Sequence, residues 1–257
     1  MRQRAKVAND SLPLQRLFCF IFIFASLNKS ITVASHNLHS FKKSSVFYKQ
    51  CLEQYGGLWL GQELWLPESR LSQLQELGVN YVAHSGMEDA ISNGILRGRP
   101  FGGVSIAWSA DLNHVIKPLV NYRHKRAVCV EATMEPDPLL IISIYMPFFD
   151  AGKRHECMAE TVETISMLEE ILSDHPLHTV IIGGDYNTEF KGSSPFDHLW
   201  SEFISKHNLI SCDSCISNPN SYTYFHDSLN QRKWNDHFLI SQSLMVTFGL
   251  KAAPLVT

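Results

Sequence analysis

The fold of this chain is decided by the stretch Val180-Ile181-Ile182-Gly183-Gly184-Asp185-Tyr186-Asn187. Its consecutive β-branched residues predict a strand that is covered on both faces, and the glycines allow the backbone to turn where the apolar run stops. Asp185 and Asn187 then lie close together. A carboxylate can bind a hard cation, and an amide can hydrogen-bond a phosphate oxygen. The alternative is a strand that ends in an Asx-turn, in which these side chains bond their own backbone.

Three further apolar runs end in polar side chains. Asn37 ends the run over 31–37, Glu63 ends the run over 58–63, and Tyr145 lies near the end of the run over 139–147. If the four strands lie in one layered domain, the polar side chains at their carboxyl ends can meet at one pole of that domain, where the strands end. Asx-turns explain only part of the set, because Glu is a poor turn residue of that type and Tyr is normally a strand residue.

The order of these motifs resembles that of the endonuclease/exonuclease/phosphatase superfamily, which includes apurinic endonucleases, pancreatic deoxyribonuclease and sphingomyelinases. The residues that carry the resemblance are Asn37, Gln62-Glu63, Tyr145-Met146-Pro147, Gly184-Asp185-Tyr186-Asn187 and Trp234-Asn235-Asp236-His237-Phe238-Leu239-Ile240-Ser241. The run from Gly98 to Trp108 is similar to a segment in the endonuclease domains of LINE-type retrotransposons. Five ordered motifs are more specific than any single motif.

The resemblance implies a fold and a reaction. The fold would be α+β, a four-layer sandwich of two packed, mainly antiparallel sheets flanked by helices, as in deoxyribonuclease, with the last strands missing. The reaction would be hydrolysis of a DNA phosphodiester. Asp185 would align or deprotonate the attacking water, Asn187 and Tyr145 would hold the non-bridging oxygens, and Asp236 would orient a histidine.

The resemblance also implies a divalent metal, held at a site formed by Asn37, Glu63 and Asp185. Two carboxylates that share a site repel one another unless a cation lies between them. Oxygen ligands suit Mg2+, with Mn2+ as the alternative, better than they suit zinc. We therefore expect Mg2+ as the cofactor, and no organic cofactor.

One departure from the superfamily concerns its late Ser-Asp-His tripeptide, because no such tripeptide follows Ser241. His237 is better interpreted as the strand residue after Asp236 than as the missing base. We therefore expect a DNA endonuclease of retrotransposon origin that has been crippled by this loss. The alternatives are an inactive remnant that binds only metal or nucleic acid, and a secreted or membrane-associated phosphodiesterase acting on lipid or inositol phosphates.

Composition permits one large domain. The chain has 257 residues, of which 45% are apolar, and we expect a monomer with its domain over residues 31–257. A net charge of -3 is not that of a protein that binds nucleic acid mainly by bulk electrostatics. Contacts with DNA would instead come from local basic groups such as Arg97, Arg99, Arg232 and Lys233.

Residues 1–30 are expected to form an extension outside this domain. Basic residues precede an apolar stretch over 17–27, which resembles the apolar region of a secretory signal but is short for a membrane span. The stretch is either signal-like or incidental, and membrane association is expected only if it acts as a signal or anchor. We expect an intracellular protein, in the nucleus as a retrotransposon endonuclease, with a secreted or anchored form as the alternative.

Overall fold

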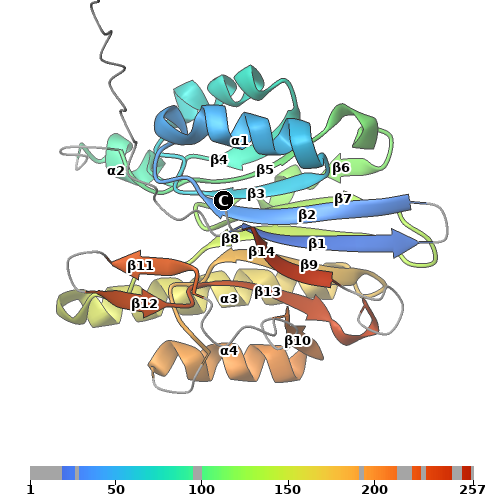
Figure 1. Cartoon of the computed structure of the whole chain (residues 1–257). Helices are drawn as coiled ribbons and strands as arrows, with labels where there is room; N and C mark the ends of the chain where they lie inside the picture. Colours follow the sequence, from blue (N-terminus) through green and yellow to red (C-terminus); the bar gives the residue numbers. More distant parts are fainter. Residues whose placement is uncertain are drawn as a thin grey trace, which may run out of the picture.

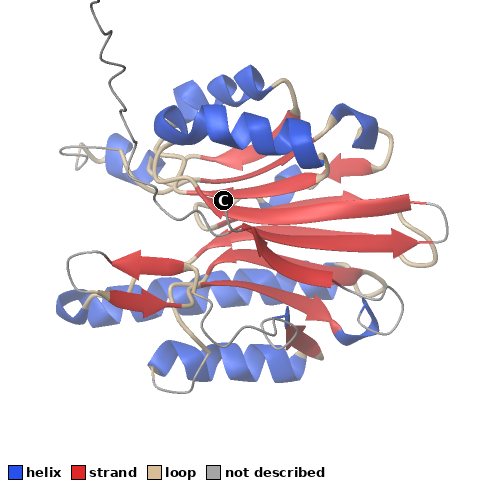
Figure 2. Ribbon diagram, in the orientation of Figure 1, coloured by secondary structure: helices blue, strands red, loops and turns tan. Residues whose placement is uncertain are grey.

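The structure is a computed structural model, and it describes residues 19–26, 29–94, 100–190, 194–212, 222–226, 230–244 and 251–255. Within these residues two six-stranded sheets face one another, and helices cover the outer face of each sheet (Figure 1). Figure 2 shows the resulting layers as helix, sheet, sheet and helix. The predicted α+β sandwich of two packed sheets is thereby confirmed.

The first sheet contains a single parallel pair. Its strands, in spatial order, are β14 (Lys251–Leu255), β1 (Cys19–Ser26), β2 (Lys29–Asn37), β3 (Leu58–Gln62), β5 (Val104–Trp108) and β4 (Asn80–His84). The strands β2 and β3 are parallel, and all other neighbours in this sheet are antiparallel.

The second sheet repeats this pattern. Its strands, in spatial order, are β10 (Leu209–Ser211), β13 (Asp236–Ser241), β9 (Thr179–Asp185), β8 (Leu139–Tyr145), β7 (Ala127–Ala132) and β6 (Ile116–Pro118). Here β8 and β9 form the parallel pair. A separate two-stranded hairpin consists of β11 (Tyr224–His226) and β12 (Gln231–Lys233).

Strand direction and register explain why the motif residues gather at one pole. Parallel neighbours end at the same edge of a sheet, and the register places Asn37 opposite Gln62 and Tyr145 opposite Asp185. The antiparallel strand β13 begins where β9 ends, so Asp236 lies opposite Asp185. Four carboxyl ends and one amino end therefore meet at the same side of the sandwich.

The core explains why β9 is apolar on both faces. Ile181 belongs to the cluster between the two sheets, whereas Val180 and Ile182 belong to the cluster between the second sheet and its helices. Each such buried side chain contributes about 1.5–3 kcal/mol. A register slip by one residue would exchange these faces, so packing fixes the position of Asp185 at the strand end.

The outer layers come from the helices. The helix α1 (Phe41–Tyr55) and the 3-10 helix η1 (Glu68–Leu77) cover the first sheet, and α3 (Arg154–Asp174) and α4 (Pro195–Lys206) cover the second. The short helices are α2 (Glu88–Ser92), η2 (Ala110–Leu112), η3 (Val120–Tyr122) and η4 (Ala151–Lys153). Helix α4 begins at a capping box formed by Ser194 and Asp197, with Pro195 in the first turn.

The two glycines of the deciding stretch act differently from the expectation. Gly183 and Gly184 stay within β9 and pair with neighbouring strands, so they do not form a turn. A Cβ on Gly183 would lie 2.3 Å from Cε1 of Phe238, and a Cβ on Gly184, whose φ is +149°, would lie 2.0 Å from the carbonyl oxygen of Ile144. Glycine is needed here for close packing.

The amino-terminal boundary also differs from the expectation. The backbone of β1 lies inside the segment expected to precede the domain, and β1 pairs with β2 and β14. The sheet therefore begins before residue 31. Among the described residues, no helix combines the length and apolar character that a membrane crossing requires.

Candidate active site

The six residues predicted to form the site line one pocket of about 220 Å³ at the common pole of the two sheets. They are Asn37, Glu63, Tyr145, Asp185, Asn187 and Asp236. The rest of the lining consists of residues that sequence reasoning did not select, namely His39, Phe148, Thr223, Tyr224 and Asn235.

Asn37 connects the two carboxylates of the expected metal site. Its Nδ2 donates to Oε1 of Glu63 at 3.1 Å and to Oδ2 of Asp185 at 2.9 Å. Its Oδ1 accepts a hydrogen bond from the backbone N–H of His39 at 3.2 Å. In this orientation Asn37 holds the carboxylates together with its N–H groups, and its oxygen is directed to the backbone.

Glu63 follows β3 in the left-handed region, with a φ of 53°. Besides Asn37, its carboxylate contacts Nδ1 of His39 at 3.0 Å and accepts a hydrogen bond from the hydroxyl of Tyr145 at 3.0 Å. Burial by itself would raise the pKa of Glu63, but the bonds to His39, Asn37 and Tyr145 outweigh it and lower this pKa. Glu63 is therefore ionised at neutral pH.

The hydroxyl of Tyr145 remains protonated. Burial raises its pKa far above the usual value, and the nearby charges of Glu63 and Asp185 raise it further. The backbone carbonyl of Tyr145 accepts a bond from Nη1 of Arg126 at 3.3 Å, and the Arg126 guanidinium lies 5.2 Å from the centre of its ring. The ring is thus fixed with its O–H directed at Glu63.

The pKa of Asp185 is shifted in the opposite direction from that of Glu63. Burial raises the pKa of Asp185 to about 6, the charge of Glu63 adds to this, and hydrogen bonds from Asn37 and from the N–H of Asn187 oppose it. The bond from Asn187 to Oδ1, at 2.9 Å, is the Asx-turn considered as the alternative interpretation. The turn and the pocket coexist, because Oδ2 is directed to Asn37.

Asn187 is positioned by its own side chain. Its φ is 52°, and its Nδ2 donates to the carbonyl oxygen of Met146 at 2.8 Å. That bond connects the segment after β9 to the segment after β8. Nδ2 carries a second hydrogen, which is the kind of donor that a phosphate oxygen accepts.

Asp236 is held through its backbone. Its N–H and that of Asn235 donate to the hydroxyl of Thr223, at 3.0 and 2.8 Å. The carbonyl of Asn235 accepts from the N–H of Tyr186 at 2.8 Å. The first residue of β13 is thereby fixed against the β11 side of the pocket.

The two histidines near the site have opposite surroundings. His237 is 1% exposed, its Nε2 lies 2.6 Å from the carbonyl oxygen of Thr188, and its ring stacks on Phe190 at 4.0 Å. His39 lines the pocket, and 43% of its side chain is exposed. The spacing that paired Asp185 with Asn187 would also have selected His39, two residues after Asn37.

Among the expected basic groups that the structure describes, Arg232 and Lys233 do not line this pocket. Arg97, Gly98 and Arg99 lie outside the described residues. Arg232 and Lys233 belong to β12, and the guanidinium of Arg232 lies over the ring of Tyr222 at 4.9 Å.

The donor chemistry of the pocket suits a hard cation. Two carboxylate oxygens, one from Glu63 and one from Asp185, lie within 3.1 Å of the same amide nitrogen. In the part of the chain that the structure describes, no three or more His, Cys, Asp and Glu side chains are grouped to hold a metal ion. The candidate ligands are thus the carboxylate oxygens of Glu63 and Asp185, and such oxygen ligands suit Mg2+ better than they suit zinc.

Comparison with known proteins supports the fold. No family model matches the sequence, and no curated protein matches it. Among solved structures, an AP endonuclease from Leishmania major is similar with a TM-score of 0.64 and 11% identity, over 94% of this chain and 84% of that chain.

Two further solved structures are similar. The endonuclease domain of TRAS1, a telomere-specific non-LTR retrotransposon, has a TM-score of 0.57 and 13% identity, over 83% of this chain and 86% of that one. A 3' phosphatase from Neisseria, bound to product DNA hairpin, has a TM-score of 0.56 and 14% identity, over 82% and 86%. The chain therefore has the fold shared by these endonuclease/exonuclease/phosphatase-type nucleases.

Proposed function

We propose that this chain is a metal-dependent phosphodiesterase that acts on DNA. The observation that carries the proposal is the convergence of Glu63 and Asp185 on one amide nitrogen, in a pocket that Tyr145 and Asn187 also line. The pocket therefore brings carboxylates, uncharged hydrogen-bond donors and space for a phosphate together at the common pole of the two sheets. The nuclease fold supports the same conclusion.

Glu63 and Asp185 would hold Mg2+, or Mn2+ as the alternative. A bound divalent cation would polarise a phosphoryl oxygen and neutralise charge that develops on the leaving group. Asn37 would keep the two carboxylates in place by the hydrogen bonds that it already makes. Without a cation, these acids would repel a phosphodiester.

The remaining residues would act on the substrate and the water. Tyr145 keeps its proton, which it donates to Glu63 in this structure and would turn to a non-bridging oxygen of a bound substrate. The second N–H of Asn187 would donate to the same kind of oxygen. Asp185 lines the same pocket, where its carboxylate would align or deprotonate the attacking water.

The proposed enzyme is weak. His237 is buried against Phe190, and among the described residues no histidine other than His39 lines the pocket. General acid-base catalysis is typically worth about a hundred- to ten-thousand-fold. A site without a histidine beside Asp236 would lose much of that, and for this reason the second candidate is a remnant that binds metal or nucleic acid without cleaving it.

The proposal includes an origin and a setting. The run from Gly98 to Trp108 supports a retrotransposon endonuclease, as does the similarity in fold to the TRAS1 domain. Such a protein would act on DNA in the nucleus, as a monomer of one domain and without an organic cofactor.

The test is cleavage of supercoiled and nicked plasmid by the full chain in Mg2+, Mn2+ or EDTA, with sphingomyelin and inositol phosphates as competing substrates. We expect slow, metal-dependent nicking that Glu63→Gln and Asp185→Asn abolish. Glu131→Gln is the matched control, because Glu131 pairs with His178 away from the pocket at 3.1 Å. Preference for either lipid-derived substrate in Mg2+ would overturn the choice of DNA.

A further inference from the structure

Phe148 has an unusual position for an apolar side chain. It is 64% exposed, and it lines the pocket three residues after Tyr145. Among the exposed large apolar side chains of the described residues, it is the one that lines this pocket. A single exposed phenylalanine is ordinary on a protein surface, so exposure alone does not mark Phe148 as a binding residue.

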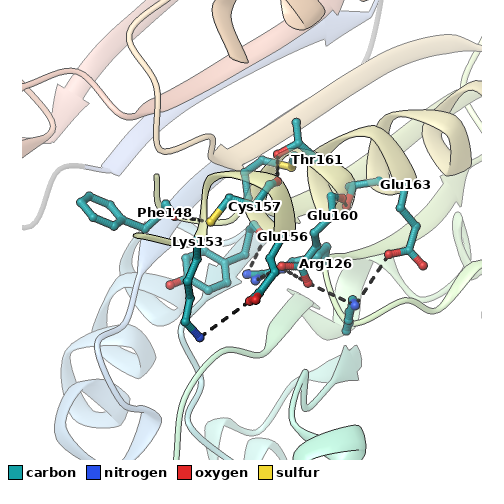
Figure 3. A network of polar contacts seen from close by, with 12 residues as sticks. Arg126, Phe148, Lys153, Glu156, Cys157, Glu160, Thr161 and Glu163 are labelled. Carbon is teal, nitrogen blue, oxygen red and sulfur yellow. Dashed lines mark hydrogen bonds and ion pairs between the residues drawn. The ribbon is translucent and has the colours of Figure 1, made fainter. Parts of the chain in front are cut away.

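The backbone that carries Phe148 is fixed from both sides. Before it, the N–H of Met146 donates to the carbonyl oxygen of Asp185 at 2.8 Å, and the carbonyl of Met146 accepts from Asn187. At Phe148 itself, Sγ of Cys157 on α3 donates to the carbonyl oxygen at 3.4 Å. Figure 3 shows this contact, with the Phe148 ring turned away from the helix.

The next residue completes this attachment. The ring of Phe149 meets the ring of Phe196 edge-on at 5.5 Å, and Phe196 is 4% exposed at the start of α4. Phe149 is therefore anchored while its neighbour Phe148 remains outside. An aromatic ring whose backbone is already ordered loses little entropy when a ligand covers it.

The surroundings of the ring define the ligand. The pocket interior carries the carboxylates of Glu63, Asp185 and Asp236, which suit a cation, and the cation in turn would bind a phosphate. Tyr224 lies in the lining contributed by the β11–β12 hairpin. A ligand with a phosphate and a flat apolar ring fits this combination. A lipid surface would instead need a contiguous apolar patch, and Phe148 has the exposed and charged residues Asp150 and Lys153 nearby in the chain.

We propose that Phe148 is a stacking platform for the nucleobase next to the phosphate in the pocket. In an intact duplex both faces of a base are covered by its neighbours. The ring would therefore select nucleic acid with an unstacked base beside the scissile phosphate, as in single-stranded, frayed or nicked DNA. Stacking on an aromatic ring tolerates all bases, so no strong sequence preference follows. This inference rests on the proposed function and defines its substrate class.

The test measures binding of the full chain to fluorescein-labelled DNA in Ca2+, which takes the same oxygen ligands as Mg2+. The probes are a single strand, its blunt duplex, and strands with one abasic nucleotide at successive positions. We expect Phe148→Ala to weaken binding to the single strand about five- to a hundred-fold. Phe148→Trp should retain binding. Leu177→Ala, which removes a side chain that is 81% exposed before β9, should change nothing.

Two results would separate this inference from the proposed function. Metal-dependent binding that Glu63→Gln abolishes and Phe148→Ala leaves unchanged would overturn the stacking platform and keep the phosphodiesterase site. Equal losses for Phe148→Ala on intact and on every abasic strand would do the same, because the lost contact would not involve a base. If the wild-type chain binds none of the probes, both proposals fail.

Discussion

Nδ2 of Asn37 donates to Oδ2 of Asp185 at 2.9 Å, and this hydrogen bond joins the two sheets at their common pole. Asn37 ends β2 in the first sheet, and Asp185 ends β9 in the second. The same nitrogen also donates to Glu63. One amide therefore sets the relative position of two carboxylates that come from opposite sheets. A cation bound by both carboxylates would bind only when the two sheets are packed together.

The first prediction concerns metal binding. Mg2+ or Mn2+ should raise the Tm of the full chain, because a ligand that binds only the folded state stabilises it, by about 2.7 kcal/mol at a hundred times its Kd. Glu63→Gln should remove most of this gain, whereas Glu131→Gln should keep it. Thermal denaturation followed by circular dichroism over a metal titration measures the effect. An unchanged metal response in Glu63→Gln would exclude Glu63 from the site.

The second prediction concerns pH in the absence of metal. The folded pKa of Asp185 is raised from 3.8 to about 6, so the folded state keeps a proton that the unfolded state has lost. Asp185 should therefore contribute stability at low pH and lose it as pH rises from about 4 to 6, by up to about 3 kcal/mol. The lowered pKa of Glu63 acts only below its usual value of 4.5.

The contribution of Asp185 is measured as the difference in free energy of unfolding between the wild type and Asp185→Asn. Burial lowers the pKa of His36 to about 3, so His36 contributes stability that is lost as pH falls from 6.5, the opposite trend. Urea denaturation of wild type and Asp185→Asn in EDTA cancels this shared effect. The advantage of Asp185→Asn should grow between pH 4 and 6, and Mg2+ should reverse it. A difference that stays constant over this range would mean that Asp185 is not buried as a protonated acid.

Much of the site could be predicted from the sequence, because strand ends are local features. Apolar runs that stop at Asn37, Glu63, Tyr145 and Asp185 required only one further assumption, that the strands lie in one domain. The roles of these residues stay predictions. The capping box of Ser194 and Asp197 is likewise local, because both residues lie within four positions of the sequence.

Other features depend on tertiary contacts and could not be predicted. A short apolar run such as residues 17–27 is equally typical of a signal segment and of a strand, and the pairing of β1 within it depends on β14, which lies far away in the sequence. The need for glycine at Gly183 comes from Phe238, 55 positions later in the printed sequence. Thr223 and Tyr224 reach the pocket through a hairpin whose strands are too short to show a period.

The third prediction tests the contact between Gly183 and Phe238. Gly183→Ala should lower the free energy of unfolding by about 1–3 kcal/mol, because the new methyl group meets Phe238 and Leu60 between the sheets. Adding Phe238→Leu should recover part of this loss, so the double variant should be more stable than the sum of the single variants. Gly152→Ala is the control, since its nearest atom would be 3.3 Å away on a surface side chain. Additive losses would show that the sheets can move apart at this point.

The last prediction distinguishes the two histidines. His237→Ala should lower the Tm, because it leaves a cavity beside Phe190 and removes the bond to Thr188. Its cleavage rate per folded molecule should remain that of the wild type. His39→Ala should have the reverse effect, since its half-exposed ring adds little to the core but contacts Oε2 of Glu63 at 3.0 Å. We expect a Tm close to that of the wild type and an altered rate of plasmid nicking in Mg2+.

The measurement is plasmid nicking by each variant at a temperature well below its Tm, with the folded fraction determined by circular dichroism in the same buffer. Glu63 makes the comparison informative, because loss of the His39 contact removes a hydrogen bond that lowers the pKa of Glu63. The pH at which nicking falls off on the acid side should therefore move upward in His39→Ala and stay unchanged in His237→Ala. If instead folded His237→Ala has no activity while His39→Ala is normal, then His237 reaches the substrate and its buried position on β13 is not the state that reacts.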